Sequence, residues 1–304
     1  MVAKNALLYL SRQEGLKNVL TKMKIFNKVT KRFVAGETIE QAVEVVKELN
    51  SRGIAASFDH LGESIKNEAE ANAEVEEYAR ILDTINERDL KCGVSIKPTQ
   101  LGLDINFDLF VKNASKIVEK AASCKRFVRI DMEDSGHTDA TLQAFRQLRS
   151  KFDNVGIVIQ AYLYRSKADV EALLKEGASI RLCKGAYDEP ASVAFPKKSD
   201  TDANYIVLMQ MMLDSGIYHG LATHDEAMIN AAVEYTAKKG IDKKAFEFQM
   251  LYGVRRDLQE KLAREGYNVR VYVPYGSHWY PYFMRRLAER PANVWFVLKN
   301  MFKG

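Results

Sequence analysis

The sequence of 304 residues lacks any apolar run close to the roughly 20 residues that a membrane-spanning helix needs. It has three cysteines, Cys92, Cys124 and Cys183, whose odd number and irregular spacing argue against a disulfide framework and favour a reducing compartment. The five histidines are scattered without cysteine partners at ligand spacing, so there is no zinc signature. The N-terminus also lacks the uninterrupted apolar core and cleavage site of a signal peptide. These absences predict a cytoplasmic protein without a metal site.

Several motifs of nucleotide-binding and hydrolytic enzymes are missing as well. There is no G-x-G-x-x-G stretch, no phosphate-cradling Walker pattern, and no Ser-His-Asp or Cys-His arrangement that stands out. Low-complexity segments and linkers rich in proline or serine are also absent. We therefore interpret the chain as one domain with an N-terminal extension.

Positive charge is concentrated at the N-terminus. Hydrophobic residues make up 47% and charged residues 28% of the chain, as in ordinary globular proteins, and the net charge is +5. Residues 1–36 contain eight lysines and arginines against Glu14 alone, a net charge of +7, so the remaining chain carries −2. The body is therefore not basic, which argues against nucleic acid as a partner.

The extension, residues 1–36, is predicted to be a basic helical arm. Apolar residues recur at mostly helical spacing among the lysines in Ala6–Lys22 and Lys24–Phe33. A basic amphipathic arm can contact an anionic membrane surface, which would place the protein peripherally at the inner face of the membrane. The alternative is that the helices pack on the body with their lysines in water.

From residue 37 to 304 the pattern alternates between helix and strand. The first element, Thr38–Asn50, is an amphipathic helix. Eight short apolar runs with polar ends follow: Ala55–Glu63, Gly93–Gly102, Phe127–Asp134, Gly156–Tyr162, Ser179–Tyr187, His219–Asp225, Phe246–Gly253 and Val269–Gly276. Helical segments separate them: Asn67–Glu87, Leu109–Ser123, Asp139–Lys151, Lys167–Glu176, Asp202–Ser215, Asp225–Lys238 and Arg255–Glu265. Eight strand–helix units in about 240 residues predict an α/β fold, a (β/α)8 TIM-like barrel with additional N-terminal helices. The rival, a doubly wound sheet, usually has a glycine-rich first turn that is missing here.

Polar side chains end each of the eight runs. In a barrel the carboxyl ends of the strands surround one cavity, so these residues are expected to form a ring around it. They are Asp59, His60, Lys97, Asp131, Gln160, Arg181, Lys184, Thr223, His224, Gln249 and Tyr272. Cations and neutral donors predominate, and such a set suits an anionic ligand.

The residues leave several roles open. Asp131 can act as a general base, orient a nearby cation, or serve as a buried salt-bridge partner. The KGAY stretch, Lys184–Tyr187, can expose backbone N–H groups to a phosphate because Gly185 and Ala186 are small. Arg285 and Arg286, next to an aromatic loop, can hold a carboxylate or can begin a solvated helix.

The motifs together resemble those of the proline dehydrogenases. The stretches are FDHLGE, SIKPTQLG, RIDMED, IQAYL, RLCKGAYDEP, ATHD, FEFQMLYG, YVPYG and YPYFMRRLAERPAN, in this order from Phe58 to about Val297. The chain looks like the short monofunctional bacterial type. The resemblance implies a distorted barrel that binds FAD and catalyses the first step of proline catabolism. L-proline is oxidised to Δ1-pyrroline-5-carboxylate by hydride transfer from C5 to the flavin N5, and a membrane quinone accepts the electrons.

The resemblance also implies roles for individual residues. Asp131 and Arg181 are expected to be catalytic, with Asp131 supporting the substrate-binding groups and Arg181 beside the flavin N5. The expected substrate-binding residues are Lys97, Leu182, Tyr187, Tyr272, Tyr282, Arg285 and Arg286. The expected cofactor-binding residues are Met132, Gln160, Arg181, Lys184, Gly185, Ala186, Thr223 and His224.

Two other functions remain as alternatives. One is a flavin-free barrel enzyme that forms a Schiff base through Lys97 with a phosphorylated or carboxylated substrate. The other is a non-catalytic binding protein built on a barrel. A flavin spectrum that proline bleaches would distinguish both from a proline dehydrogenase.

Overall fold

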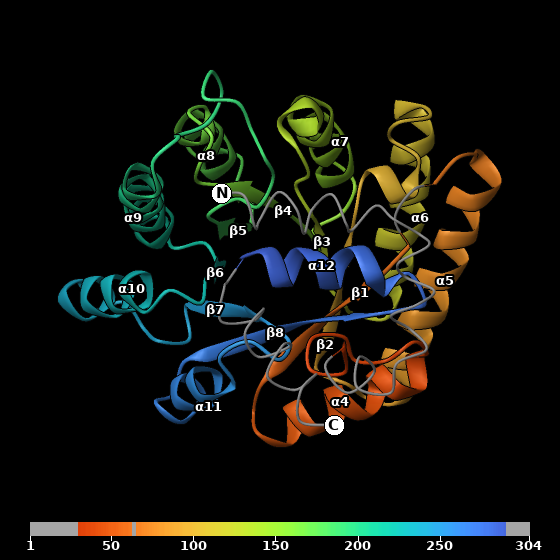
Figure 1. Ribbon diagram of the computed structural model, residues 1–304, viewed down its shortest axis with the longest axis horizontal. Coiled ribbons are helices and arrows are strands. Elements are labelled where there is room, and N and C mark those ends of the chain that lie inside the picture. The colour runs from red at the N-terminus through yellow and green to blue at the C-terminus, as the bar shows by residue number, and fades with distance from the viewer. Residues whose placement is uncertain (1–29, 63–64, 290–304) are drawn as a thin grey trace.

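The structure, a computed structural model, describes residues 30–62 and 65–289. Most of the predicted basic arm, residues 1–29, lies outside the described residues. The strands form one closed parallel barrel in sequence order, and β1 pairs with both β2 and β8 to complete the ring. Helices surround this ring (Figure 1). The predicted (β/α)8 architecture is confirmed.

The eight strands coincide with the eight apolar runs of the sequence. They are β1 Ala55–His60, β2 Cys92–Ile96, β3 Val128–Ile130, β4 Val155–Gln160, β5 Ile180–Cys183, β6 His219–Ala222, β7 Phe246–Leu251 and β8 Asn268–Tyr275. Each strand ends before its predicted run does, because the last residues of every run belong to the following loop. Those loops lie together at the carboxyl ends of the parallel strands.

Alternation along each strand separates an apolar outer face from a polar inner face. In β8, Val269, Val271 and Val273 are buried in the core between the barrel and the helices, whereas Arg270 and Tyr272 bond with groups on other strands. Side chains of successive strand residues point to opposite faces, so a two-residue period gives this separation. The barrel interior is therefore unusually polar for a fold whose interior is commonly filled by branched apolar residues.

The helices follow the strands in the expected order. They are α4 Ile39–Ser51, α5 Glu68–Glu87, α6 Phe107–Ser123, α7 Thr138–Arg149, α8 Ser166–Lys175, α9 Lys198–Asp214, α10 Glu226–Lys239, α11 Arg256–Arg264 and α12 Trp279–Glu289. Local signals set several of their ends. The side chains of Asn67, Asn106 and Asp225 accept backbone N–H bonds at the starts of α5, α6 and α10. Gly240, in the left-handed conformation, ends α10.

The last helix departs from the regular barrel pattern. Helix α4, which precedes the barrel, packs beside β1 and β8 at the outside of the ring. Figure 1 draws α12 across the middle of the view, inside the ring made by the other helices. The last helix therefore does not take a place among the helices that surround the barrel.

The described end of the arm, residues 30–36, is bound to the barrel through its backbone. The Ala35 N–H donates to the Pro274 carbonyl at 2.8 Å, and the Gly276 N–H donates to the Gly36 carbonyl at 3.0 Å. Phe33 is buried, with its ring centroid 6.1 Å from that of Phe283 on α12. The end of the arm and the last helix therefore share one apolar contact.

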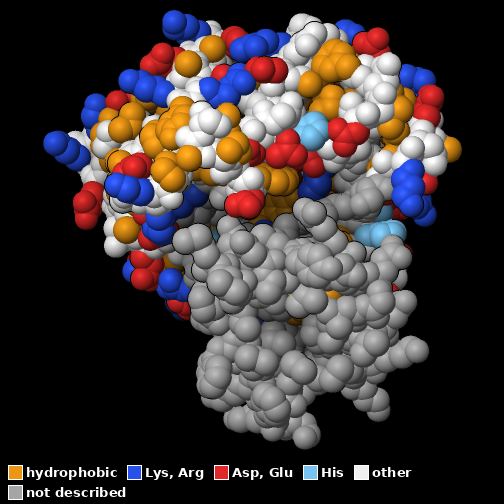
Figure 2. Space-filling model, turned by 45° about the horizontal axis from the view of Figure 1, so that its top comes forward, with side chains coloured by type: hydrophobic (Ala, Val, Ile, Leu, Met, Phe, Trp, Pro, Cys, Tyr) orange, Lys and Arg blue, Asp and Glu red, His pale blue; other side chains and the backbone are white. Residues whose placement is uncertain are grey.

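The described surface is mixed in charge. On the face drawn in Figure 2, lysines and arginines are interspersed with aspartates and glutamates over the described part of the molecule. Within that part, no helix combines the length and the apolar character that crossing a bilayer requires.

Candidate active site

Four side chains, two on β5 and β8 and two directly after β2 and β3, form a bonded network at the mouth of the barrel. Arg181 of β5 donates from Nη1 to Oδ1 of Asp131 at 2.8 Å, and the Tyr272 hydroxyl donates to the other oxygen, Oδ2, at 2.7 Å. Lys97 Nζ lies 3.2 Å from the Tyr272 hydroxyl. The predicted residues Lys97, Asp131, Arg181 and Tyr272 are thus brought together from β5, β8 and the ends of β2 and β3.

A second carboxylate, Asp59 of β1, completes the network. It forms an ion pair with Lys97 and is fully buried. Burial raises the pKa of the Asp59 carboxyl, an effect that the positive charge of Lys97 opposes. Its second oxygen, Oδ2, is buried and has no hydrogen-bond partner among the described residues. The sequence placed Asp59 in the ring of strand ends but did not assign it a role.

Arg181 is fixed from three sides. Besides Asp131, it donates from Nε to Gln249 Oε1 at 2.5 Å and from Nη2 to Ser95 Oγ at 3.1 Å. Its guanidinium carbon lies 5.4 Å from the centre of the Tyr272 ring, within the range of a cation–π contact. Burial and the negative charge of Asp131 raise the pKa of Tyr272 well above its usual value, so this phenol stays protonated and can donate.

Lys184, in the loop after β5, belongs to a separate group of charges with Lys198 and Asp202 of α9 and Asp225 at the start of α10. Lys184 pairs with Asp225 at 2.7 Å and with Asp202, and Lys198 bonds to the same two carboxylates. The hydrogen bond from Lys184 lowers the pKa of Asp225 to about 2. Two cations shared by two carboxylates leave this group close to neutral, so Lys184 does not add a net positive charge to the ring of strand ends.

The KGAY loop depends on its glycine. Gly185 has a φ of +115°, and a Cβ there would lie 2.2 Å from the ring of Tyr162. Ala186 is exposed, and the side chain of Tyr187 is 39% exposed. A residue with a side chain could not replace Gly185 without moving Tyr162 or the loop.

The other predicted cofactor residues lie on β3, β4 and β6 or just beyond their ends. Gln160 is buried and donates from Nε2 to the Glu133 carbonyl at 2.7 Å. His224 accepts the Leu251 N–H at 2.8 Å through Nε2, which fixes that nitrogen as unprotonated. The hydroxyl of Thr223 accepts the Asp225 N–H at 3.1 Å, and Met132 is buried in the core.

The structure does not place Leu182 beside the network. Leu182 adjoins Arg181 in β5, so its side chain points to the opposite face, where it is fully buried in the core between barrel and helices. The expectation that it lines a substrate cavity is therefore wrong on geometric grounds. Leu251 at the end of β7 is two residues beyond Gln249 on the same face and pairs in register with Tyr272. The alternation within each strand was the signal that would have selected Leu251.

Helix α12 supplies the remaining predicted residues. The side chain of Tyr282 is buried, and the guanidinium carbon of Arg286 lies 5.0 Å from its ring centre. Arg285 belongs to the same helix, but its side chain falls outside the part of the chain that the structure describes. Within that part, no group of three or more His, Cys, Asp or Glu side chains is arranged to hold a metal ion.

The fold and this site define a (β/α)8-barrel enzyme whose polar groups gather at the strand ends. The sequence profile of the family described as Proline dehydrogenase matches residues 42–299. The chain belongs to the proline dehydrogenase family and is an oxidoreductase.

Its relatives are matched over most of their length. It is similar to Proline dehydrogenase 1 of Bacillus subtilis strain 168, with 46% identity over 90% of each chain. It is 41% identical to Proline dehydrogenase 2 of the same strain, and the match covers 100% of both chains. It is 45% identical to the Proline dehydrogenase of Deinococcus radiodurans, and that match covers 94% of this chain and 93% of the relative. The resemblance to the monofunctional bacterial type is confirmed.

The barrel also resembles part of larger solved proteins. The structure of proline utilization A from Bdellovibrio bacteriovorus, inactivated by N-propargylglycine, superposes with a TM-score of 0.82 at 26% identity. The match covers 87% of this chain and 33% of that one. The predicted fold is therefore shared with a barrel inside a longer polypeptide.

Proposed function

We propose that the chain oxidises L-proline to Δ1-pyrroline-5-carboxylate with FAD as its cofactor, as the first step of proline catabolism. Membership in the proline dehydrogenase family supports the substrate. The observation that supports the site most strongly is the network that joins Lys97, Asp131, Arg181 and Tyr272. It combines cations, a protonated phenol and a carboxylate that orients them.

The residues around β4, β5 and β6 fit FAD in their chemistry. The donors are the cations Arg181 and Lys184, the amide of Gln160 and the polar groups of Thr223 and His224, and these suit a pyrophosphate and a heteroaromatic ring. Met132, Gly185 and Ala186 would add backbone contacts. When bound, FAD supplies the acceptor for the hydride that leaves proline C5. Arg181, held rigidly by three partners, would stabilise negative charge beside it.

The substrate would be held by opposite charge at one end and by rings at the other. Arg285 and Arg286 would hold the proline carboxylate, because guanidinium groups bind carboxylates through two parallel hydrogen bonds. Lys97 would add a third positive charge. Tyr272 and Tyr282 would line the pyrrolidine ring and exclude water, and Tyr187 would approach from the loop after β5. Leu251, which lies on the inner face next to Tyr272, would contact the ring in the role first expected of Leu182.

In this proposal Asp131 bonds to Arg181 and Tyr272 and does not contact the substrate. Both of its oxygens are occupied, one by Arg181 and the other by Tyr272. With both oxygens bonded, Asp131 has no free oxygen to accept a proton from the substrate and would orient Arg181 and Tyr272. The proline amine would therefore lose its proton before binding.

A membrane quinone would accept the electrons, and the protein would work in the cytoplasm at the inner face of the membrane. The basic arm, residues 1–36, would provide the peripheral contact, since its net charge of +7 favours anionic lipids. Deletion of residues 1–33 should weaken binding to anionic vesicles. Unchanged binding would show that the arm only packs on the body.

The surroundings of Lys97 argue against the alternative, a Schiff-base enzyme. Its ammonium group pairs with the buried Asp59, and an adjacent carboxylate stabilises the charged form over the neutral amine that attacks a carbonyl. Barrel aldolases instead need that amine free.

An absorbance spectrum of the purified protein, with and without L-proline, tests the proposal. We expect a yellow protein whose flavin absorbance is bleached by proline and which turns over proline with an artificial acceptor. A colourless protein that FAD does not reconstitute would overturn the assignment. A flavin spectrum that proline leaves unchanged would keep the cofactor and reject the substrate.

A further inference from the structure

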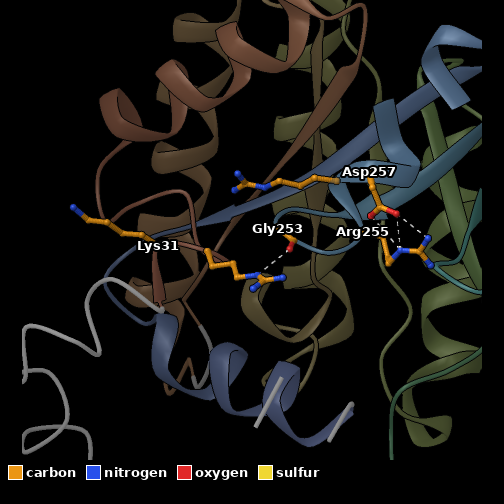
Figure 3. Close-up of a pocket in the computed structure, with 6 residues that line it drawn as sticks. Lys31, Gly253, Arg255 and Asp257 are labelled. Carbon is orange, nitrogen blue, oxygen red and sulfur yellow. Dashed lines mark hydrogen bonds and ion pairs between the residues drawn. The ribbon is translucent and has the colours of Figure 1, made fainter. Parts of the chain in front are cut away.

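A cavity of about 540 Å³ lies between the end of the arm and the loop that joins β7 to α11. Its walls are Lys31, Arg32, Gly253, Arg255, Arg256 and Asp257 (Figure 3). None of the residues in the network around Tyr272 lines it. The cavity is therefore a feature separate from the candidate active site.

The charges in this cavity are not balanced. Asp257 bonds to Arg255 at 2.9 Å, as the dashed lines in Figure 3 show, and Arg255 also pairs with Glu226 at 2.7 Å. Lys31 and Arg256 make no ion pair with any residue of the described part of the chain. Two positive charges in a concave site thus have no carboxylate partner among the described residues.

The backbone fixes the cavity in place. Gly253 has a φ of +76°, and a Cβ there would lie 1.6 Å from the carbonyl oxygen of Arg32. The Arg32 side chain returns over this glycine, with Nε 3.5 Å from the Gly253 carbonyl oxygen. Glycine is required here because the arm packs so closely on the loop. Arg32 is therefore held at the cavity by the fold and is not part of a loose tail.

Two of the cationic side chains, those of Arg32 and Arg256, lie near enough for their charges to repel. Burial and the nearby charge of Arg256 lower the pKa of Arg32. Arg256 lies over the ring of Tyr252, with its guanidinium carbon 5.1 Å from the ring centre, which orients it. Arg256 is also the first residue of α11, where the helix dipole is positive. An anion in the cavity would relieve this repulsion.

We propose that this cavity binds a phosphate-bearing anion. Two unbalanced charges suit a ligand with two negative charges, and guanidinium groups match the geometry of phosphate oxygens. Inorganic phosphate and the phosphate of a lipid headgroup share this chemistry. The proposal does not rest on the activity proposed above, and Arg256 is not part of the machinery assigned to proline.

The first experiment measures binding of inorganic phosphate to the full-length protein, as purified, by calorimetry at low salt. Arg256→Gln and Lys31→Gln should each weaken binding roughly tenfold, since each removes a charge-assisted hydrogen-bond donor. Arg264→Gln is the matched control, because Arg264 is an exposed arginine on the same helix and does not line the cavity. It should bind as the unaltered protein does.

The second experiment uses sedimentation with phosphatidylglycerol vesicles and with phosphatidylcholine vesicles. Selective loss of phosphatidylglycerol binding in Arg256→Gln, but not in Arg264→Gln, would identify a lipid headgroup as the ligand. Loss of affinity for inorganic phosphate without a change in vesicle binding would identify a free phosphate. If neither probe binds, or if Arg264→Gln weakens binding as much as Arg256→Gln does, the proposal is wrong. Proline turnover in Arg256→Gln should be unchanged, which separates this test from that of the proposed activity.

Discussion

At the scale of single residues, Tyr272 is the point where the charges of the site meet. Its hydroxyl bonds to Asp131, while Lys97 and Arg181 both lie near its ring or hydroxyl. A phenol in this position links the cation after β2 to the cation of β5 without carrying charge itself. The substrate proposed here would enter between this residue and Tyr282 of α12.

Replacing Arg286 with methionine tests the carboxylate site. We expect proline binding to weaken by roughly 2–5 kcal/mol, the cost of removing one partner of a desolvated charge pair. Flavin content should remain intact, because Arg286 is assigned to the substrate. The measurement is a titration with proline followed by flavin absorbance, with Arg264→Met as the control. Loss of the flavin instead would place Arg286 on the cofactor side.

His219, at the start of β6, predicts a pH dependence of stability. Its Nδ1 accepts the Ile180 N–H at 3.0 Å, and burial together with the charge of Arg129 lowers its pKa from 6.5 to about 4. The folded state therefore binds fewer protons than the unfolded state between these values, and stability falls as the pH falls through this window. The loss between pH 7 and pH 5 should be about 2 kcal/mol.

Urea unfolding of the protein and of His219→Asn at both pH values checks this prediction. The asparagine oxygen can accept the same N–H but does not titrate, so the variant should lose less stability on acidification. An identical pH dependence in both proteins would show that His219 does not cause it.

Sequence reasoning identified the polar residues of the site better than the apolar ones. Lys97, Asp131, Arg181 and Tyr272 were predicted and are in contact, because a charged or polar residue at a strand end has few other reasons to be there. Leu182 was misplaced, since an apolar residue gives no sign of which face of a strand it occupies. Only the two-residue alternation from Arg181 settles that question.

At the scale of elements, the loop after β5 is the most constrained. Gly185 combines a positive φ with close packing against Tyr162. We expect Gly185→Ala to lower the free energy of unfolding by more than Gly177→Ala does. Gly177 also has a positive φ, +69°, but a Cβ there meets nothing within 4 Å.

Comparing the two substitutions separates the cost of backbone strain from the cost of a steric clash with Tyr162. Gly177→Ala should cost about 1 kcal/mol, the strain of a left-handed conformation alone. Urea unfolding provides the values, and flavin content of the purified Gly185→Ala protein shows whether the loop also supports the cofactor. Equal effects of the two substitutions would contradict the contact between Gly185 and Tyr162.

The elements themselves were predictable because the periodicity changes sharply between strand and helix. Five of the eight strands fell inside the predicted runs, and β2, β4 and β8 each begin one residue before theirs. The intervening helices were found with ends displaced by a few residues. The position of α12 was not predictable in this way. Its apolar residues indicate a helix but not which surface it covers, and that depends on α4 already occupying the outside of β1 and β8.

At the scale of the whole molecule, closure of the barrel predicts cooperative unfolding. β1 pairs with β8, about 215 residues later in the sequence, so neither end can leave without opening the ring. We expect urea unfolding monitored by far-UV and by near-UV circular dichroism to give the same midpoint. Two separated transitions would show that part of the molecule unfolds independently of the barrel.

The position of α4 has a consequence for folding during translation. Helix α4 emerges before β1 and fills the outer place beside β1 and β8, so the wall of the barrel is complete once β8 has been synthesised. Helix α12 follows only after that. The arginines proposed to hold proline are thus translated after the barrel, and after Lys97 and Tyr272, which the same proposal assigns to proline.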